Sequence, residues 1–203
     1  MSLLAFLFAA AVLAISPGPG IAYVVVRTVA GGRSEGLASC LGTGIGGMLH
    51  VLAAALGISL IVAQSALAFS LVKYLGAAYL VYLGIRMLLR NEPALTCKPI
   101  APQGALRALL EGIAVEALNV KTALFFLAFL PQFVSPAEPL VPQLVLLGSI
   151  CVSLNTIVDV VVVLAAARLL KSQSARAARA RLLTRVSGVT LVSLGAYLAL
   201  AKR

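Results

Sequence analysis

Long apolar stretches without charge constrain this chain more than any other feature of its sequence. The segment from Gly36 to Val72 contains no Asp, Glu, Lys or Arg, and the first charged side chain is Arg27. A stretch of about 18 apolar residues is already long enough to cross the hydrocarbon core of a bilayer. Because such stretches recur along the chain, we expect an all-α polytopic membrane protein.

The composition agrees with this expectation. Of the 203 residues, 62% are hydrophobic and 11% are charged, and the mean hydropathy is +1.09. A soluble domain is about half apolar and a quarter charged. A soluble fold is therefore excluded, because its core could not bury this much apolar surface.

Polar, proline and glycine punctuation divides the chain into six predicted transmembrane helices. They lie at residues 3–26, 37–63, 66–88, 112–134, 140–167 and 182–201. The first lacks the basic leader of a signal peptide, so we interpret it as a retained helix. We expect one transmembrane domain over 1–203, with half-repeats at about 1–90 and 111–203 and a linker at 91–110. Three helices in each half give two inverted repeats.

Basic side chains predict the orientation. The net charge is +10, with an isoelectric point near 10.2. Twelve basic residues fall in or beside the first, third and fifth loops: Arg27, Arg33, Arg86, Arg90, Lys98, Arg107, Arg168, Lys171, Arg176, Arg179, Arg181 and Arg185. By the positive-inside bias these loops are cytoplasmic and both termini lie outside. Trp is absent and aromatic residues do not alternate with the basic ones, so we expect no nucleic-acid partner.

Polar residues gather at one predicted depth, near the middle of the membrane. They are Ser16, Pro17, Gly18, Pro19 and Gly20 of helix one, His50 of helix two, Asn119 and Lys121 of helix four, and Asn155 and Asp159 of helix five. Two prolines that flank a glycine predict a broken helix one, whose free backbone groups could face a charged solute. The alternative is an ordinary proline kink.

Helix four also contains Glu116. A charge at the bilayer centre costs roughly 2.5–3.5 kcal/mol on insertion scales, so it normally has a partner or a function. Glu116 and Asn119 are three residues apart and share a face. We expect Lys121 to meet Asp159, either as a static bridge or as a site where substrate or a proton changes the partner.

Other motifs are weaker. His50 either titrates during transport or forms a hydrogen bond between helices. The glycines from Gly42 to Gly47 predict close helix packing. Cys40, Cys97 and Cys151 have no metal or disulfide spacing. No phosphate loop or catalytic triad is present, so we expect a transporter without cofactor or enzymatic activity, driven by an ion gradient.

Several motifs in series resemble the LysE/RhtB translocators. They are Ser16-Pro-Gly-Pro19, the glycine-rich approach to His50, Lys73-Tyr-Leu-Gly76, and Asn119-x-Lys121 followed by Leu124 to Phe133. The resemblance covers essentially the whole chain. It implies a bacterial plasma-membrane exporter of amino acids or close derivatives, driven by the proton motive force. It places the family's motif positions at Ser16 to Pro19, Asn119 and Lys121.

Three positions depart from that pattern. Gly20 stands where the family usually has a polar residue, Val120 stands where it usually has proline, and Glu116 stands where Asn is frequent. Gly20 therefore lacks a side-chain ligand, Val120 predicts a less broken helix four, and Glu116 predicts an altered charge preference.

The expected partners are an amino-acid substrate, protons and the lipid bilayer, and a homo-oligomer is compatible with such a chain. We carry His50, Glu116 and Asp159 as candidates for ion coupling. Two alternative functions remain open at this stage. A membrane thiol or redox carrier would need paired cysteines within the membrane, and a metal-ion exporter would need more soft ligands than one histidine and three scattered cysteines.

Overall fold

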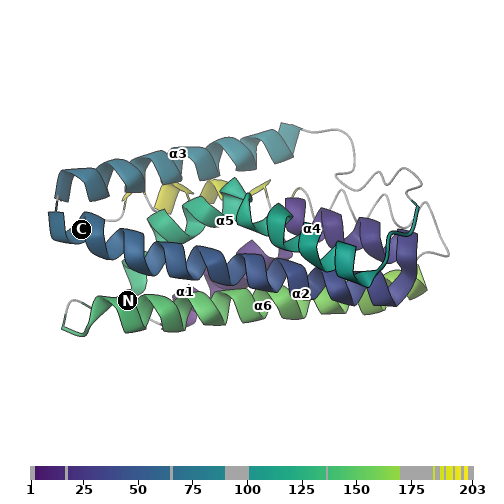
Figure 1. Cartoon of the computed structure of the whole chain (residues 1–203). Coiled ribbons are helices and arrows are strands. Elements are labelled where there is room, and N and C mark those ends of the chain that lie inside the picture. Colours follow the sequence, from purple (N-terminus) through teal and green to yellow (C-terminus); the bar gives the residue numbers. More distant parts are fainter. Residues whose placement is uncertain are drawn as a thin grey trace.

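A computed structural model describes residues 3–16, 18–64, 66–89, 101–135 and 137–169, and single helical residues or short pieces between 185 and 200. Within these residues every regular element is helical, as the sequence predicted. The elements are α1 (Leu3–Ile15), α2 (Pro19–Gln64), α3 (Ala66–Leu89), α4 (Ala105–Ala117), α5 (Val120–Leu124), the π-helical turn η1 (Phe125–Phe129), the 3-10 turn η2 (Leu130–Phe133) and α6 (Leu140–Leu169). Figure 1 shows them as an elongated bundle.

The element α2 is two helices joined at Gly32. This glycine has φ 71° and ψ −161°, a conformation that a residue without a Cβ adopts at little cost. The first part of α2 runs to one end of the bundle, where the chain turns back into the long second part (Figure 1). The predicted gap between residues 26 and 37 is therefore a sharp turn between continuous helices.

Glycines allow the second part of α2 to lie close to two other helices. A Cβ on Gly46 would lie 2.7 Å from the carbonyl oxygen of Ile113 in α4, and a Cβ on Gly42 would collide with the backbone of the same helix. Gly44 and Gly47 face α6 instead, where added Cβ atoms would meet Thr156 and Val152 at 3.1 Å. The predicted close packing is confirmed, and α2 lies between α4 and α6 because of these small residues.

The apolar core lies among α1, α2, η1 and α6. The largest buried side chains there include Phe6 of α1, Phe125 and Phe129 of η1, and Leu144 of α6. The rings of Phe125 and Phe129 are 4.8 Å apart between centroids. The ring of Phe6 lies 5.4 Å from that of Phe133 between centroids, so aromatic contacts join α1 to η2.

The outer surface of the bundle is apolar as well. On α2, exposed side chains recur on one face: Leu41, Ile45, Leu49, Leu52 and Leu56. Among the described residues, Pro19–Gly57 and Leu140–Ala165 are long and apolar enough to span a membrane, and the bent pair Ala105–Ala117 and Val120–Phe133 makes a third candidate. Apolar residues outside and polar residues inside are the distribution that a bilayer favours.

A polar cluster holds α4 at the end of the bundle where α2 turns. Arg27 and Glu35 form a buried ion pair of 3.4 Å. Glu35 Oε1 also accepts hydrogen bonds of 2.7 Å from the backbone N–H groups of Gln103 and Gly104, immediately before α4. Tyr23 donates to the carbonyl oxygen of Ala108 at 2.9 Å. The cluster thus fixes the start of α4 against both parts of α2.

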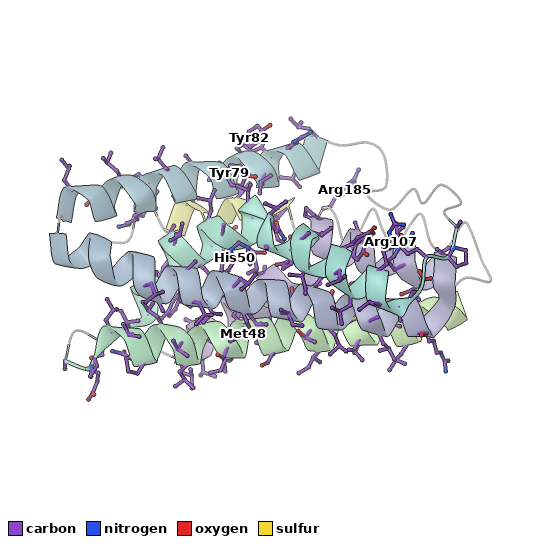
Figure 2. All side chains as sticks on the ribbon, viewed as in Figure 1. Met48, His50, Tyr79, Tyr82, Arg107 and Arg185 are labelled. Carbon is purple, nitrogen blue, oxygen red and sulfur yellow. The ribbon has the colours of Figure 1, made fainter. Side chains whose placement is uncertain are left out.

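The ends of α3 and α6 and the start of α4 lie at this same end of the bundle (Figure 1). Residues 91–100 of the predicted linker and residues 170–184 fall outside the described residues. Figure 2 shows Arg107 at the same end of the bundle. Its guanidinium forms an ion pair of 2.9 Å with Glu111.

Candidate functional site

Helix one is interrupted between α1 and α2, as the sequence predicted. Ser16 and Gly18 are not helical, and Pro17 lies outside the described residues. Pro19 and Gly20 are not part of the interruption, because α2 already begins at Pro19. Proline suits the first position of a helix, where its missing N–H would have no partner. The break is therefore shorter than the segment from Ser16 to Gly20.

Helix four is interrupted as well, between α4 and α5. The chain leaves α4 at Leu118, and the two halves are bent by 45°. Asn119 caps α5, since its side-chain Oδ1 accepts a hydrogen bond of 3.1 Å from Lys121 N. Helix four is thus broken although Val120 stands where the family usually has proline. The asparagine cap starts a new helix there without a proline.

Lys121 reaches from this second break to the first one. Its ammonium group donates hydrogen bonds to the carbonyl oxygens of Ser16 at 2.9 Å and Leu13 at 3.4 Å. These carbonyls close the C-terminal end of α1, where the helix dipole favours a positive charge. The predicted contact with Asp159 does not form between these two described residues. The ammonium is bound instead by the carbonyl groups at the end of α1.

Glu116 supplies the opposite charge. Its Oε2 accepts a hydrogen bond of 3.0 Å from Asn119 Nδ2, and its Oε1 accepts one of 2.7 Å from Thr122 Oγ1. The predicted shared face of Glu116 and Asn119 is confirmed. A Cβ added to Gly20 would lie 2.7 Å from Oε2, so the carboxylate rests against the first turn of α2. That helix end favours a negative charge.

His50 connects α2 to the end of α4. Its Nε2 lies 2.7 Å from the carbonyl oxygen of Glu116. A carbonyl only accepts, so Nε2 carries the hydrogen of this bond. Figure 2 shows His50 in the middle of the bundle, close to the break in helix four. Of the two roles considered for this residue, the structure contains the hydrogen bond between helices.

A pocket opens where the two breaks meet. Its cavity volume in this conformation is about 20 Å³, enough for a water molecule. Its charged and polar lining comes from Glu116, Asn119, Lys121, Thr122, Thr43 and Asn155. Its apolar lining includes Leu13, Ile21, Phe126 and Val152. Gly18 and Gly20 also line it, whereas Ser16 contributes its carbonyl oxygen to Lys121.

Asp159 lies beside the pocket and is fully buried. Its Oδ2 lies 3.1 Å from Thr43 Oγ1. Thr43 itself lines the pocket, so one hydroxyl group separates Asp159 from the space inside. Cys40 and Cys151 are buried and free, and Cys97 lies outside the described residues.

Two lining residues, Thr43 and Thr122, were not singled out from the sequence. A threonine in an apolar helix is unremarkable by itself, because its hydroxyl can bond to the carbonyl one turn back. The position of Thr43 among the buried glycines of α2 was the available signal. Thr122 is recognisable only once the bend brings it to Glu116.

The lining presents groups that complement both charges of a small molecule. A carboxylate could take a hydrogen bond from Lys121, and an ammonium could donate to Glu116. Each protein charge is already paired with neutral groups, so a bound molecule would exchange hydrogen bonds without leaving a bare charge. No step of covalent chemistry is required.

The comparisons with known proteins point to a transporter family. The LysE type translocator profile matches residues 11–202. An uncharacterized membrane protein of Vibrio cholerae is 36% identical over 156 residues, which is 76% of each chain. A homoserine/homoserine lactone efflux protein of Salmonella typhimurium is 30% identical over 155 residues, covering 76% of this chain and 75% of the relative.

A leucine efflux protein of Salmonella choleraesuis is 30% identical over 139 residues, covering 66% of this chain and 64% of the relative. No solved structure matches this chain. The profile covers both helix breaks and every residue that lines the pocket, so the match includes the whole candidate site. The chain therefore belongs to the LysE type translocator family.

Proposed function

We propose that this chain exports amino acids or close derivatives across the bacterial plasma membrane as a secondary transporter. The observation that carries the proposal is the pocket between the two helix breaks, where Lys121 and Glu116 contribute opposite charges. The relatives named as homoserine and leucine efflux proteins support an amino-acid substrate. A zwitterion has the two charges that such a pocket complements.

In the proposed complex, the substrate carboxylate binds the Lys121 ammonium. The substrate ammonium binds the Glu116 carboxylate. The side chain of the substrate lies against Leu13, Ile21 and Phe126. Ser16, Pro17, Gly18, Pro19, Gly20, Asn119 and Lys121 form the proposed substrate site. Gly18 allows the close approach of Lys121, since a Cβ there would lie 2.9 Å from Nζ.

We further propose six transmembrane helices in two inverted repeats that give alternating access to this pocket. The support is that helix one and helix four, the first helix of each proposed half, are both broken and meet at the pocket. Broken helices at a repeat interface are the usual site of substrate binding in such transporters. The basic ends of the bundle would face the cytoplasm and both termini the outside.

Proton coupling completes the proposal. His50, Glu116 and Asp159 are the candidates for the group that exchanges a proton during the cycle. Glu116 lines the pocket, His50 contacts the backbone of Glu116, and Asp159 contacts Thr43 of the lining. A proton entering from outside would return the empty transporter to its cytoplasm-facing state.

Everted membrane vesicles test the export function. Vesicles from cells that produce this chain are energised by respiration and supplied with labelled homoserine, leucine and lysine in separate assays. We expect accumulation of at least one, lost with a protonophore and lost in Lys121→Met. Arg107→Ala is the matched control, because this side chain is 70% exposed at the end of the bundle. If folded protein transports no amino acid in an extended panel, the proposal is wrong.

A further inference from the structure

Asp159 has a hydrogen-bonding environment that differs from that of the other buried acid. Its side chain is fully buried in α6, facing α2. Oδ1 has no hydrogen-bond partner in the part of the chain that the structure describes. Oδ2 has one neighbour, Thr43 Oγ1 at 3.1 Å. A carboxylate with full negative charge would leave most of its acceptor capacity unused here, at high cost in a buried site.

The hydroxyl of Thr43 cannot serve all of its acceptors at once. It lies 3.0 Å from the carbonyl oxygen of Cys40 and 3.1 Å from Asp159 Oδ2, and it has a single hydrogen. If Asp159 carries a proton on Oδ2, that O–H donates to Thr43 Oγ1, and the Thr43 hydrogen donates to Cys40 O. Both short contacts are then hydrogen bonds, which the ionised form of Asp159 does not allow simultaneously.

Glu116 provides the contrast. Each of its carboxylate oxygens accepts a hydrogen bond, from Asn119 Nδ2 and from Thr122 Oγ1. The titratable groups that act on Asp159 from the helices around it are Cys40 of α2, Glu116 of α4 and Lys121 of α5. Lys121 is occupied by the carbonyl groups of α1, so its charge is not directed to Asp159 by a hydrogen bond.

We propose that Asp159 is protonated in this conformation, that it carries the exchanged proton, and that Thr43 couples its charge to the pocket. The inference rests on the proposed export function and selects one of its three proton candidates. When Asp159 releases its proton to water, the Thr43 hydroxyl turns to donate to the new carboxylate. A lone pair of Thr43 Oγ1 then faces the pocket. The negative charge of the Asp159 carboxylate lies on the other side of this hydroxyl group.

This arrangement makes protons and substrate compete without sharing a site. The ionised form of Asp159 strengthens binding of a substrate ammonium in the pocket, and the protonated form weakens it. Linkage is reciprocal, so substrate binding must promote release of the proton by the same factor. Competition of this kind produces antiport, because the transporter carries either a proton or a substrate through the membrane.

Infrared spectroscopy of the purified full-length chain in lipid tests the protonation directly. At neutral pH we expect a carboxylic-acid C=O band that disappears in Asp159→Asn and remains in Glu116→Gln. Thr43→Val should shift the band to higher frequency, because the acid loses its hydrogen-bond acceptor, and Thr43→Ser should restore it. Ser153→Ala is the control on α6, since the Ser153 hydroxyl donates to Ser149 O of the same helix at 2.8 Å. A band that Asp159→Asn leaves intact overturns the proposal.

A transport measurement separates this inference from the export function. In proteoliposomes loaded with a labelled amino acid that the wild type transports, we expect Asp159→Asn to exchange substrate while losing its response to a proton gradient. The response of Thr43→Val should fall about tenfold, with Thr43→Ser restoring it. An Asp159→Asn variant that still accumulates substrate with the proton gradient refutes the role of Asp159 and leaves export standing. Absence of transport in the wild type refutes export, while the infrared result still reports the proton on Asp159.

Discussion

Gly20 leaves the space against which the Glu116 carboxylate rests. A Cβ on Gly20 would lie 2.7 Å from Glu116 Oε2, closer than side chains normally approach. On the other side of Pro19, a Cβ on Gly18 would lie 2.9 Å from Lys121 Nζ. Two glycines of the first broken helix thus accommodate the two charges of the second.

Gly20→Ala should impair the pocket more than the fold. The atom that must move is the end of a flexible side chain, so we expect the free energy of unfolding to change by less than about 1 kcal/mol. The displaced carboxylate loses its bond to Asn119, and we expect KM for the transported amino acid to rise about tenfold, equivalent to ~1.4 kcal/mol. Thermal unfolding and vesicle uptake measure the two effects. An unchanged KM would argue against Glu116 as a substrate ligand.

Gly46→Ala should impair the fold more than the pocket. Its added methyl group would meet backbone atoms of α4, including Ile113 O at 2.7 Å, and backbone cannot move aside as a side chain can. Overpacking of this kind costs about 1–3 kcal/mol. Gly57→Ala is the matched control, because nothing lies within 4 Å of its Cβ position. The folded yield and the unfolding temperature in detergent should fall for Gly46→Ala and not for Gly57→Ala. Equal stability of the two would show that α2 and α4 can separate freely.

Glu35→Ala should be strongly destabilising. It leaves the Arg27 guanidinium buried without its partner and removes the acceptor of two backbone N–H groups before α4. Breaking a buried pair in this way costs about 3–5 kcal/mol. Arg107→Ala removes an exposed pair instead, worth about 0.5 kcal/mol at most. Thermal unfolding compares the two variants. A loss for Glu35→Ala no larger than that for Arg107→Ala would exclude the buried cluster as a support of α4.

His50→Gln should keep the pH dependence of transport. The glutamine amide can still donate to Glu116 O, which is the contact that His50 makes. His50→Leu should lose this bond and destabilise the break in helix four by about 1–3 kcal/mol. Uptake as a function of pH distinguishes the roles of this residue. A flattened profile in His50→Gln, with stability retained, would identify the histidine rather than Asp159 as the group that titrates.

The break in helix one and the shared face of Glu116 and Asn119 were predictable from the sequence. Proline lacks a backbone N–H donor and glycine allows unusual dihedral angles, so these residues predict an interrupted helix one. Glu116 and Asn119 are three residues apart and therefore share a face of a helix. The break in helix four has a less predictable cause. Side-chain capping by Asn119 replaced the expected effect of a proline, and capping depends on a side-chain conformation that spacing alone does not specify.

Apolar run lengths and residue chemistry determined the all-helical class and the membrane environment, since both follow from local periodicity and the cost of charge in hydrocarbon. The choice of partners was decided by the tertiary structure. Lys121 binds the carbonyl groups of α1 instead of Asp159, and Asp159 faces Thr43. Such pairings depend on how broken helices approach one another, and that approach is set by glycine contacts between segments far apart in sequence.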